Sequence, residues 1–171
     1  MNILGLDPST LNTGWGIISL GLSDGMVYVD GGVIKPKRSM ALNDRIHFIF
    51  TAVKRILKKY QIDHIASESG YVGFQNHKTS MSLQAARTAC HLAVVESGHR
   101  WDEIKPSEAK RAATGSGSSS KDAVAEMVYI SLGSPQELIG ASDDVTDALA
   151  VAIAHAGNLK EKRLEDLNLE P

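Results

Sequence analysis

The chain of 171 residues is the size of one domain, and its composition, 43% hydrophobic and 22% charged, is ordinary for a soluble globular protein. No apolar run approaches the length of a membrane span, and no basic stretch precedes the first apolar run, so we expect neither a membrane protein nor a secretory leader. The single cysteine, Cys90, lies in an apolar helical pattern, which predicts a buried thiol in the reducing cytoplasm. A net charge of −2 argues mildly against a nucleic-acid partner, but cations bound by clustered acids would reverse the local sign.

The first third of the chain predicts strands and the first long helix. Short apolar runs broken by glycines indicate three successive strands at Asn2–Asp7, Gly14–Leu20 and Met26–Ile34. Apolar residues then recur at helical spacing over Ala41–Tyr60, and alternation over Ile62–Glu68 predicts a fourth strand.

The rest of the chain predicts mainly helices. We expect a helix over Thr79–Ser97, a short strand over Arg100–Ile104, a short helix that opens at Pro106, and helices over Lys121–Leu132 and Asp144–Ala156. A hairpin meander followed by strand–helix units predicts an α/β fold with a mixed five-stranded sheet flanked by helices.

The predicted organisation is a single domain. We expect it to span residues 1–157 and to be followed by a charged C-terminal tail over residues 158–171. Thr114–Ser120, with the sequence TGSGSSS, is the most flexible segment by composition.

Two acids stand at the ends of predicted strands. Asp7 directly follows apolar strand residues, and an unpaired carboxylate buried there would cost several kcal/mol, which indicates a functional role. An aspartate before Pro8 is equally typical of a turn, which is the alternative interpretation. Glu68 ends the fourth strand, and a lone glutamate there is more often simply solvated. If the two strands are parallel neighbours, however, both acids meet at one edge of the sheet.

The last predicted helix opens with three aspartates. Asp144 and Asp147 are three residues apart and therefore project from the same helix face. Acids in a first helical turn stabilise it by roughly 0.3–1 kcal/mol each, which explains Asp143 and Asp144 but fits Asp147 less well, because an apolar run follows it. The spacing leaves the pairs Asp143/Asp147 and Asp144/Asp147 open, and we prefer the second.

Four carboxylates that converge need cations to neutralise them. Oxygen-only ligands suit Mg²⁺ or Mn²⁺, and two such ions about 4 Å apart can support in-line hydrolysis of a phosphodiester. The acids thus point to a metal-dependent nuclease with two ions in each active site.

Four segments of the chain resemble the RuvC family of Holliday junction resolvases. They are ILGLDPSTLNTGWGII at positions 3–18, SESGY at 67–71, AKRAATGSGSSSKDAV at 109–124 and DDVTDALAVAIAH at 143–155. Each segment alone is weakly specific, but the combination is specific and extends to about Ala156. The resemblance implies a ribonuclease-H-like fold and a divalent-metal-dependent endodeoxyribonuclease that cuts crossover junctions in recombination and repair.

The resemblance also implies roles for individual residues. The implied metal ligands are Asp7, Glu68, Asp144 and Asp147. Lys121 matches the family's basic catalytic residue, Lys110 a DNA-facing lysine, and Tyr71 an aromatic residue that helps to open the junction centre. The family acts as a homodimer that nicks two strands symmetrically, and the helix Thr79–Ser97 is the implied dimer element.

One segment departs from the bacterial pattern. It is SGYVGFQNHKTS, between the glutamate and the following helix. This divergence would suit a phage-encoded member that acts on branched DNA in general, including three-way junctions and flaps.

Basic and aromatic residues near these motifs are candidate DNA contacts. They are Tyr71, Phe74, Lys78, Lys110, Arg111 and Lys121. The Gly/Ser loop is bracketed by Lys110, Arg111 and Lys121, and such a flexible basic loop can bind phosphates through its side chains and backbone N–H groups. Isolated lysines elsewhere on a surface are usually only solvated. Stacking of Tyr71 or Phe74 on unpaired bases contributes roughly 1–3 kcal/mol per base, although Phe74 fits a loop folded back on the domain equally well.

Two other classes of function remain open from the sequence. The opening LGLDPSTLNTG also resembles the phosphate loop of actin-like ATPases and sugar kinases, which need two such domains where this chain has room for one. The other class is a non-catalytic module that binds branched DNA or RNA, and a processing factor for ribosomal RNA on the same fold is a further alternative. ATP binding would favour the first class, and a preference for RNA substrates would favour the processing factor. An Asp7→Asn variant that keeps junction binding but loses cleavage would exclude the non-catalytic module.

Overall fold

The computed structural model describes residues 1–21, 25–69 and 77–168. A five-stranded sheet forms the centre, in the order β3-β2-β1-β4-β5. Its strands are β1 (Asn2–Asp7), β2 (Thr13–Leu20), β3 (Met26–Ile34), β4 (His64–Glu68) and β5 (Asp102–Ile104). β1, β2 and β3 pair antiparallel, whereas β4 pairs parallel with both β1 and β5. The predicted mixed α/β sheet is therefore confirmed.

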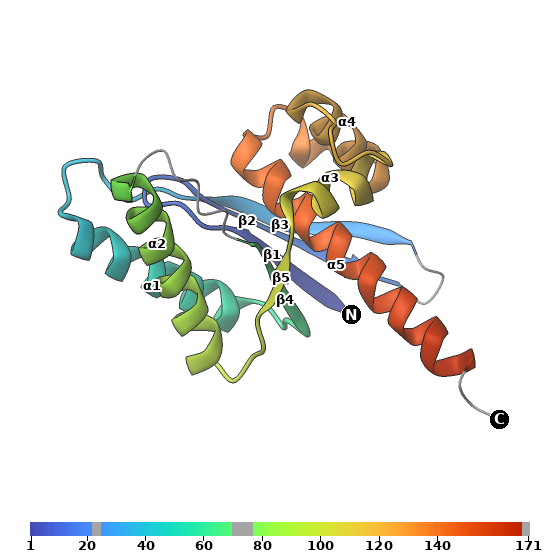
Figure 1. Ribbon diagram of the computed structural model, residues 1–171, viewed down its shortest axis with the longest axis horizontal. Coiled ribbons are helices and arrows are strands. Elements are labelled where there is room, and N and C mark those ends of the chain that lie inside the picture. Colours follow the sequence, from blue (N-terminus) through green and yellow to red (C-terminus); the bar gives the residue numbers. More distant parts are fainter. Residues whose placement is uncertain (22–24, 70–76, 169–171) are drawn as a thin grey trace.

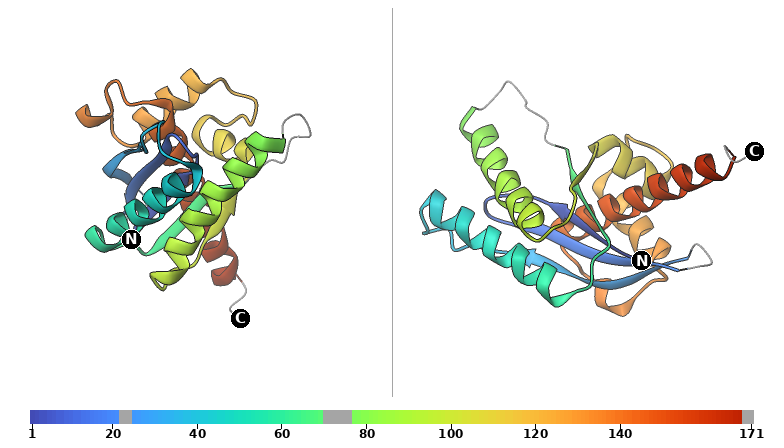
Figure 2. Two further views of the ribbon diagram at one scale, coloured as in Figure 1. Left: turned by 90° about the vertical axis from the view of Figure 1, so that its left-hand side faces the viewer. Right: turned by 90° about the horizontal axis from the view of Figure 1, so that it is seen from below.

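Helices cover both faces of the sheet (Figures 1 and 2). One face carries α1 (Leu42–Lys59) and α2 (His77–Glu96). The other carries α3 (Pro106–Thr114), α4 (Lys121–Ser131) and α5 (Asp143–Asn168), with the short 3₁₀ helix η1 (Gln136–Leu138) between α4 and α5. The molecule thus has three layers and two separate hydrophobic cores, one on each side of the sheet.

The alternation of side chains along β1 explains the two cores. Leu4 and Leu6 are fully buried in the core beneath α1 and α2, whereas Ile3 is buried beneath α5. Successive side chains of a strand point to opposite faces. Asp7 therefore shares the α5 face with Ile3 and Gly5.

Three glycines let α5 lie directly on the strands. A Cβ atom at Gly5 would be 1.9 Å from the carbonyl oxygen of Ala148, and one at Gly14 would be 1.8 Å from that of Asp144. A Cβ atom at Gly16, which pairs with Gly5, would be 2.5 Å from the side chain of Leu149. Only residues without a side chain permit this approach of helix and strand backbones.

The structure differs from the prediction at several boundaries. α5 continues to Asn168 rather than ending at Ala156, so the predicted tail begins within a helix. β5 starts at Asp102 rather than Arg100. The segment predicted to be flexible is hydrogen-bonded through its hydroxyls: those of Thr114 and Ser119 are 2.7 Å apart. No helix in the described part of the chain is both long enough and apolar enough to cross a bilayer.

Candidate active site

The two strand-end acids lie side by side. Asp7 and Glu68 end the parallel neighbours β1 and β4, whose register pairs Leu6 with Ser67 one residue earlier. Ala66 packs in the core beneath α5, so Glu68, two residues later, projects from the same face as Asp7. The sheet therefore brings together two carboxylates that are 61 positions apart in the sequence.

The first turns of α5 bring the other two acids to this edge. Gly14 pairs with Asp7 across β1 and β2, and the backbone of Asp144 packs against Gly14. Asp144 and Asp147 are both half-buried, whereas Asp143 is exposed. The structure thus places Asp144, rather than Asp143, on the side of Asp7.

Lys121 reaches the same place from α4. Its Nζ atom lies 2.7 Å from Oδ2 of Asp147. Lys121 is the first residue of α4, whose N-cap Ser120 accepts a hydrogen bond from the backbone N–H of Ala123. The hydrogen bond to Asp147 raises the pKa of the Lys121 ammonium, which therefore stays charged.

The electrostatics show that the acids share one environment. Burial, and then the charges of Glu68, Asp147 and Asp144, raise the pKa of Asp7 to about 7. Burial and then Asp147 likewise raise the pKa of Glu68, whereas nearby cations, Lys121 first, lower it. Excess negative charge is therefore concentrated at this edge of the sheet.

A cavity of about 310 Å³ opens at the acids, and Lys110 and Lys121 line it together with Asp7, Glu68 and Asp147. Pro106 and Ala109 of α3 form part of its wall, as do Ala150 and Val151 of α5. The structure thus combines carboxylates and ammonium groups in one hollow.

The donor set fits a hard divalent cation. All the converging ligands are carboxylate oxygens, which Mg²⁺ and Mn²⁺ prefer, and the raised pKa values reflect negative charge that a cation would neutralise. Among the described residues no three acidic, histidine or cysteine side chains already surround a common point at ligand distances. One oxygen of Asp147 instead faces the ammonium group of Lys121.

The remaining candidates are distributed differently. Lys110 lines the acidic cavity, but Arg111 lines another hollow, with Glu108 and the middle of α5. Tyr71 and Phe74 lie outside the described residues, as does the side chain of Lys78. The structure therefore brings Lys110 and Lys121, but not Arg111, to the acids.

Sequence reasoning missed Arg87. Arg87, on α2, donates a hydrogen bond to the carbonyl oxygen of Glu68. Its position among the buried Ala86, Ala89 and Cys90 was the available signal, because a charge beside a buried helix face needs a partner. His155, the last residue of the segment at 143–155, is buried in the middle of α5.

Comparison with known proteins agrees with this geometry. A family model described as "Crossover junction endodeoxyribonuclease RuvC" matches residues 3–155. The curated RuvC of Anaplasma marginale (strain Florida) is 32% identical over 162 residues, covering 95% of this chain and 97% of the relative. That of Brachyspira hyodysenteriae is 35% identical over 156 residues, covering 91% and 94%.

Solved structures show the same fold. The RuvC of T. thermophilus in complex with a Holliday junction substrate has a TM-score of 0.81 at 22% identity, covering 94% of this chain and 96% of that one. The Holliday junction resolvase of fowlpox virus has a TM-score of 0.57 at 14% identity, covering 92% and 99%. Together with the match over residues 3–155, these findings show that the chain belongs to the RuvC family of crossover junction endodeoxyribonucleases, the metal-dependent nucleases that resolve Holliday junctions.

Proposed function

We propose that the protein resolves four-way junctions and other branched DNA as a homodimer, with two Mg²⁺ or Mn²⁺ ions in each active site. The proposed ligands are the carboxylates of Asp7, Glu68, Asp144 and Asp147. The observation that carries the proposal is the burial and mutual repulsion of these acids, which raise the pKa of Asp7 to about 7. Several carboxylates that are buried close together destabilise the fold unless a cation compensates their charge.

The chemistry that such ions supply is activation of a water molecule and neutralisation of charge on the attacked and leaving oxygens of a phosphodiester. The protein's own contribution is placement. Asp7 and Glu68 are held by strand pairing, and Asp144 by contact of the α5 backbone with Gly14. Preorganised groups of this kind are worth more in a partly enclosed cavity than in water.

The lysines of the cavity are suited to the DNA backbone. Lys121 is paired with Asp147, and Lys110 lines the same cavity as Glu68. We propose that both ammonium groups contact the phosphate at the cut, Lys121 as the basic catalytic residue. The cluster thereby attracts a polyanion despite the acidic residues at its centre.

Further DNA contacts are proposed for residues around this cavity. Tyr71 and Phe74 follow Glu68 closely in sequence, so their rings are candidates for stacking on bases left unpaired at the branch. Lys78, in the first turn of α2, and Arg111, outside the acidic cavity, are proposed to bind phosphates of the junction arms.

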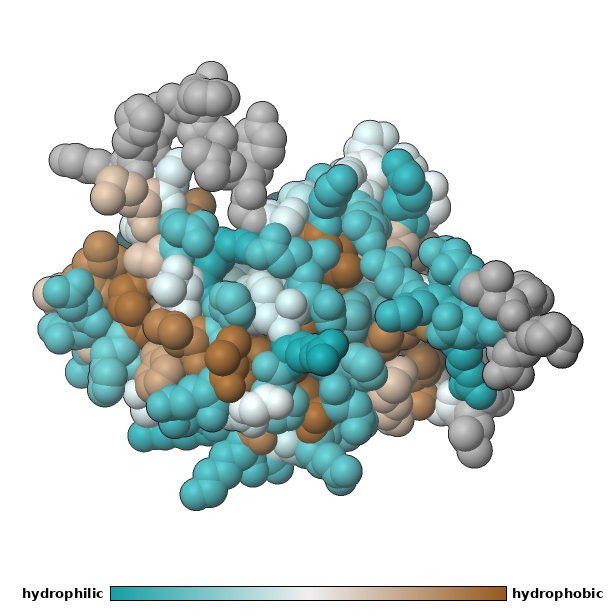
Figure 3. All heavy atoms as spheres, turned by 60° about the horizontal axis from the view of Figure 1, so that its bottom comes forward, coloured by the Kyte–Doolittle hydropathy of each residue, from teal (hydrophilic) through white to brown (hydrophobic). Residues whose placement is uncertain are grey.

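The homodimer is supported by an apolar stripe along α2. It consists of Met81, Ala85, Leu92 and Val95, and with the polar Thr88 among them these positions are spaced alternately by four and three residues. Met81 is 73% exposed, Leu92 58% and Val95 55%. This 3.5-residue period is the pattern by which helices pair in coiled coils. Hydrophobic surface runs across the side of the molecule formed by α1 and α2, on the left of Figure 3.

The partner that we propose for this stripe is α2 of a second copy of the chain. A twofold pair of identical helices is self-complementary, and it would place two active sites symmetrically about a junction that has twofold symmetry. Two such sites would produce paired nicks on opposite strands.

The test is cleavage of labelled four-way, three-way and linear duplex DNA with Mg²⁺, with Mn²⁺ and with EDTA. We expect paired cuts across the four-way junction that require metal, slower cuts at three-way junctions, and an intact linear duplex. Asp7→Asn should bind the junction as tightly as wild type and lose cleavage. The exposed Asp166→Asn is the matched control and should cleave normally.

Metal-dependent cutting of linear duplex at the same rate would contradict the structural selectivity. Full cleavage activity of Asp7→Asn would contradict the assigned ligands. Junction binding by the wild type without any cleavage would instead favour the non-catalytic module.

A further inference from the structure

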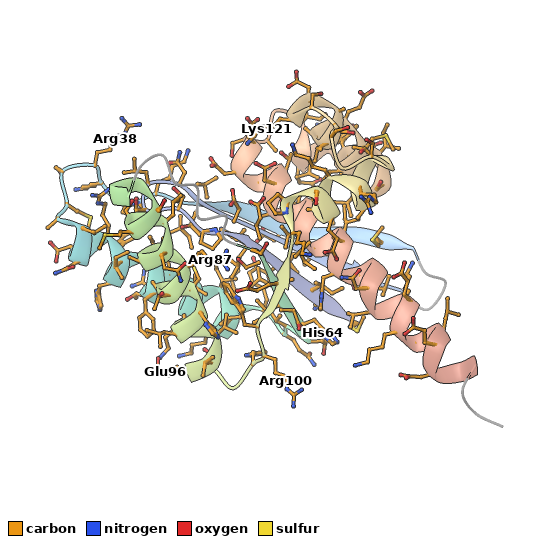
Figure 4. The ribbon with its side chains drawn as sticks, in the orientation of Figure 1. Arg38, His64, Arg87, Glu96, Arg100 and Lys121 are labelled. Carbon is orange, nitrogen blue, oxygen red and sulfur yellow. The ribbon has the colours of Figure 1, made fainter. Side chains whose placement is uncertain are left out.

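The backbone of Glu68 is anchored from the face of the sheet opposite to its carboxylate. Glu68 projects toward α5, on the same face as Ala66. Its carbonyl oxygen accepts a hydrogen bond from Nη1 of Arg87, whose side chain extends from α2 toward the sheet (Figure 4). The strand end is therefore held between the cavity on one face and α2 on the other.

The second arm of the Arg87 guanidinium binds the neighbouring strand. Its Nη2 atom lies 2.8 Å from Oε1 of Glu103 on β5. Ile104 is buried beneath α5, so Glu103, one residue earlier, projects toward α2. Because Glu103 pairs with Ser67 in the β4–β5 register, Arg87 joins the ends of two adjacent strands to one helix.

The environment of Arg87 distinguishes it from a DNA contact. Its side chain is only 12% exposed, and both terminal nitrogens are engaged within the protein. The planar guanidinium donates along two fixed directions, a geometry that the flexible lysine ammonium does not reproduce. Arg87 thus has the properties of an internal clamp.

We infer that Arg87 is a positioning residue for the cleavage reaction: it fixes the end of β4 and so sets the place of the Glu68 carboxylate at the cavity. The inference rests on the proposed role of Glu68 as a metal ligand. Displacement of a reacting group by about 1 Å can lower a rate about 100-fold, so loss of the clamp should matter although Arg87 touches no substrate. α2 also carries the proposed dimer stripe, so the same residue links that stripe to the active site.

The test uses full-length proteins and a labelled four-way junction. Cleavage rates under substrate saturation, the Mg²⁺ concentration at half-maximal rate, and junction binding without metal are compared for wild type, Glu68→Gln, Arg87→Ala and Arg87→Lys. Lys54→Ala is the matched control, because it also removes an ion pair of α2, 2.7 Å long, to Glu96 at the C-terminal end of the helix (Figure 4).

We expect Arg87→Ala to lower kcat by about 10- to 100-fold and to raise the half-saturating Mg²⁺ concentration several-fold. Junction affinity without metal should change by less than about twofold, because Arg87 does not face the DNA. Arg87→Lys should recover part of kcat, since one ammonium can keep one of the two contacts. Lys54→Ala should behave as wild type.

Wild-type values of kcat and metal dependence for Arg87→Ala would overturn the inference. So would an Arg87→Lys variant with no recovery, or a loss of junction binding that parallels the loss of cleavage. If circular dichroism shows that Arg87→Ala is unfolded, Arg87→Gln, which keeps a donor for the Glu68 carbonyl, takes its place with the same criteria. An inactive wild type or a fully active Glu68→Gln would instead contradict the proposed function.

Discussion

Gly14 pairs with Asp7 across β1 and β2, and the carbonyl oxygen of Asp144 lies 1.8 Å from the point where a Cβ atom of Gly14 would be. One glycine therefore separates two of the proposed metal ligands. Its lack of a side chain determines how closely the first turn of α5 approaches the sheet.

Gly14→Ala is expected to displace α5 and to weaken cleavage. The added methyl group would overlap backbone atoms, which cannot rotate away, so we expect a loss of about 1–3 kcal/mol in the free energy of unfolding. Cleavage should fall about tenfold or more, because Asp144 moves relative to Asp7. Urea denaturation and junction cleavage measure the two effects. Gly25→Ala is the control, since a Cβ there meets no atom within 4 Å. Equal behaviour of the two variants would show that α5 adjusts freely.

The raised pKa of Asp7 predicts a pH-dependent instability of the metal-free protein. Its carboxyl titrates at about 7 in the fold and near 3.8 when unfolded, so folding binds a proton between these values. The free energy of unfolding should therefore decrease as pH rises from about 4 to 7, by at most about 4 kcal/mol from this group. Below pH 4 the group is protonated in both states and has no effect.

Asp7→Asn removes the ionisable carboxyl, and with it the loss of stability that its ionisation causes at high pH. In EDTA at pH 8 the variant should be more stable than wild type in thermal or urea unfolding, and the difference should vanish toward pH 4. Asp166→Asn, at an exposed position, should show no such difference. A variant that is less stable than wild type at pH 8 would mean that Asp7 is not penalised by its surroundings.

Lys121→Met should lower cleavage about 100-fold or more, because it removes the cation that faces Asp147 and, in our proposal, the phosphate. Junction binding should weaken only slightly, since one of several phosphate contacts is lost. Single-turnover cleavage and gel-shift titration separate the two quantities. Lys58→Met, on the exposed side of α1, is the control. Unchanged single-turnover cleavage would remove Lys121 from the catalytic group.

Leu92→Asp should convert the proposed dimer into monomers. The substitution places a charge in the apolar stripe of α2, where Leu92 is 58% exposed in the single chain. Light scattering after size-exclusion chromatography should show half the mass, and paired nicks should give way to single, uncoordinated ones. Ile139→Asp alters an equally apolar residue, 69% exposed and outside α2, and should remain dimeric. A dimeric Leu92→Asp would place the interface elsewhere.

Local patterns were sufficient to predict the strands and the acids. Short apolar runs mark where β1 and β4 end, and so place Asp7 and Glu68 at strand ends. That the two acids meet was only conditional, because β2, β3 and α1 lie between β1 and β4 in the chain and the parallel pairing of the two strands is a long-range contact. The preference for Asp144 over Asp143 agrees with their different exposure.

Long-range contacts could not be predicted in the same way. The partners of Arg87 lie on β4 and β5, and only the packing of α2 on the sheet brings them together. The role of Gly14 likewise depends on where α5 lies, about 130 positions later. The continuation of α5 beyond Ala156 was missed because its charged second half has few buried contacts to mark it.

α5 is a single unbroken helix whose first two turns carry Asp143, Asp144 and Asp147 and whose far end projects beyond the sheet (Figure 1). At about 1.5 Å per residue, its 26 residues form a rod of about 39 Å. Any tilt of the rod on the glycines would be magnified at the distal end, near the exposed Leu164. A spin label or fluorophore at that position would report, in solution and in real time, how the catalytic end moves when metal or a junction binds.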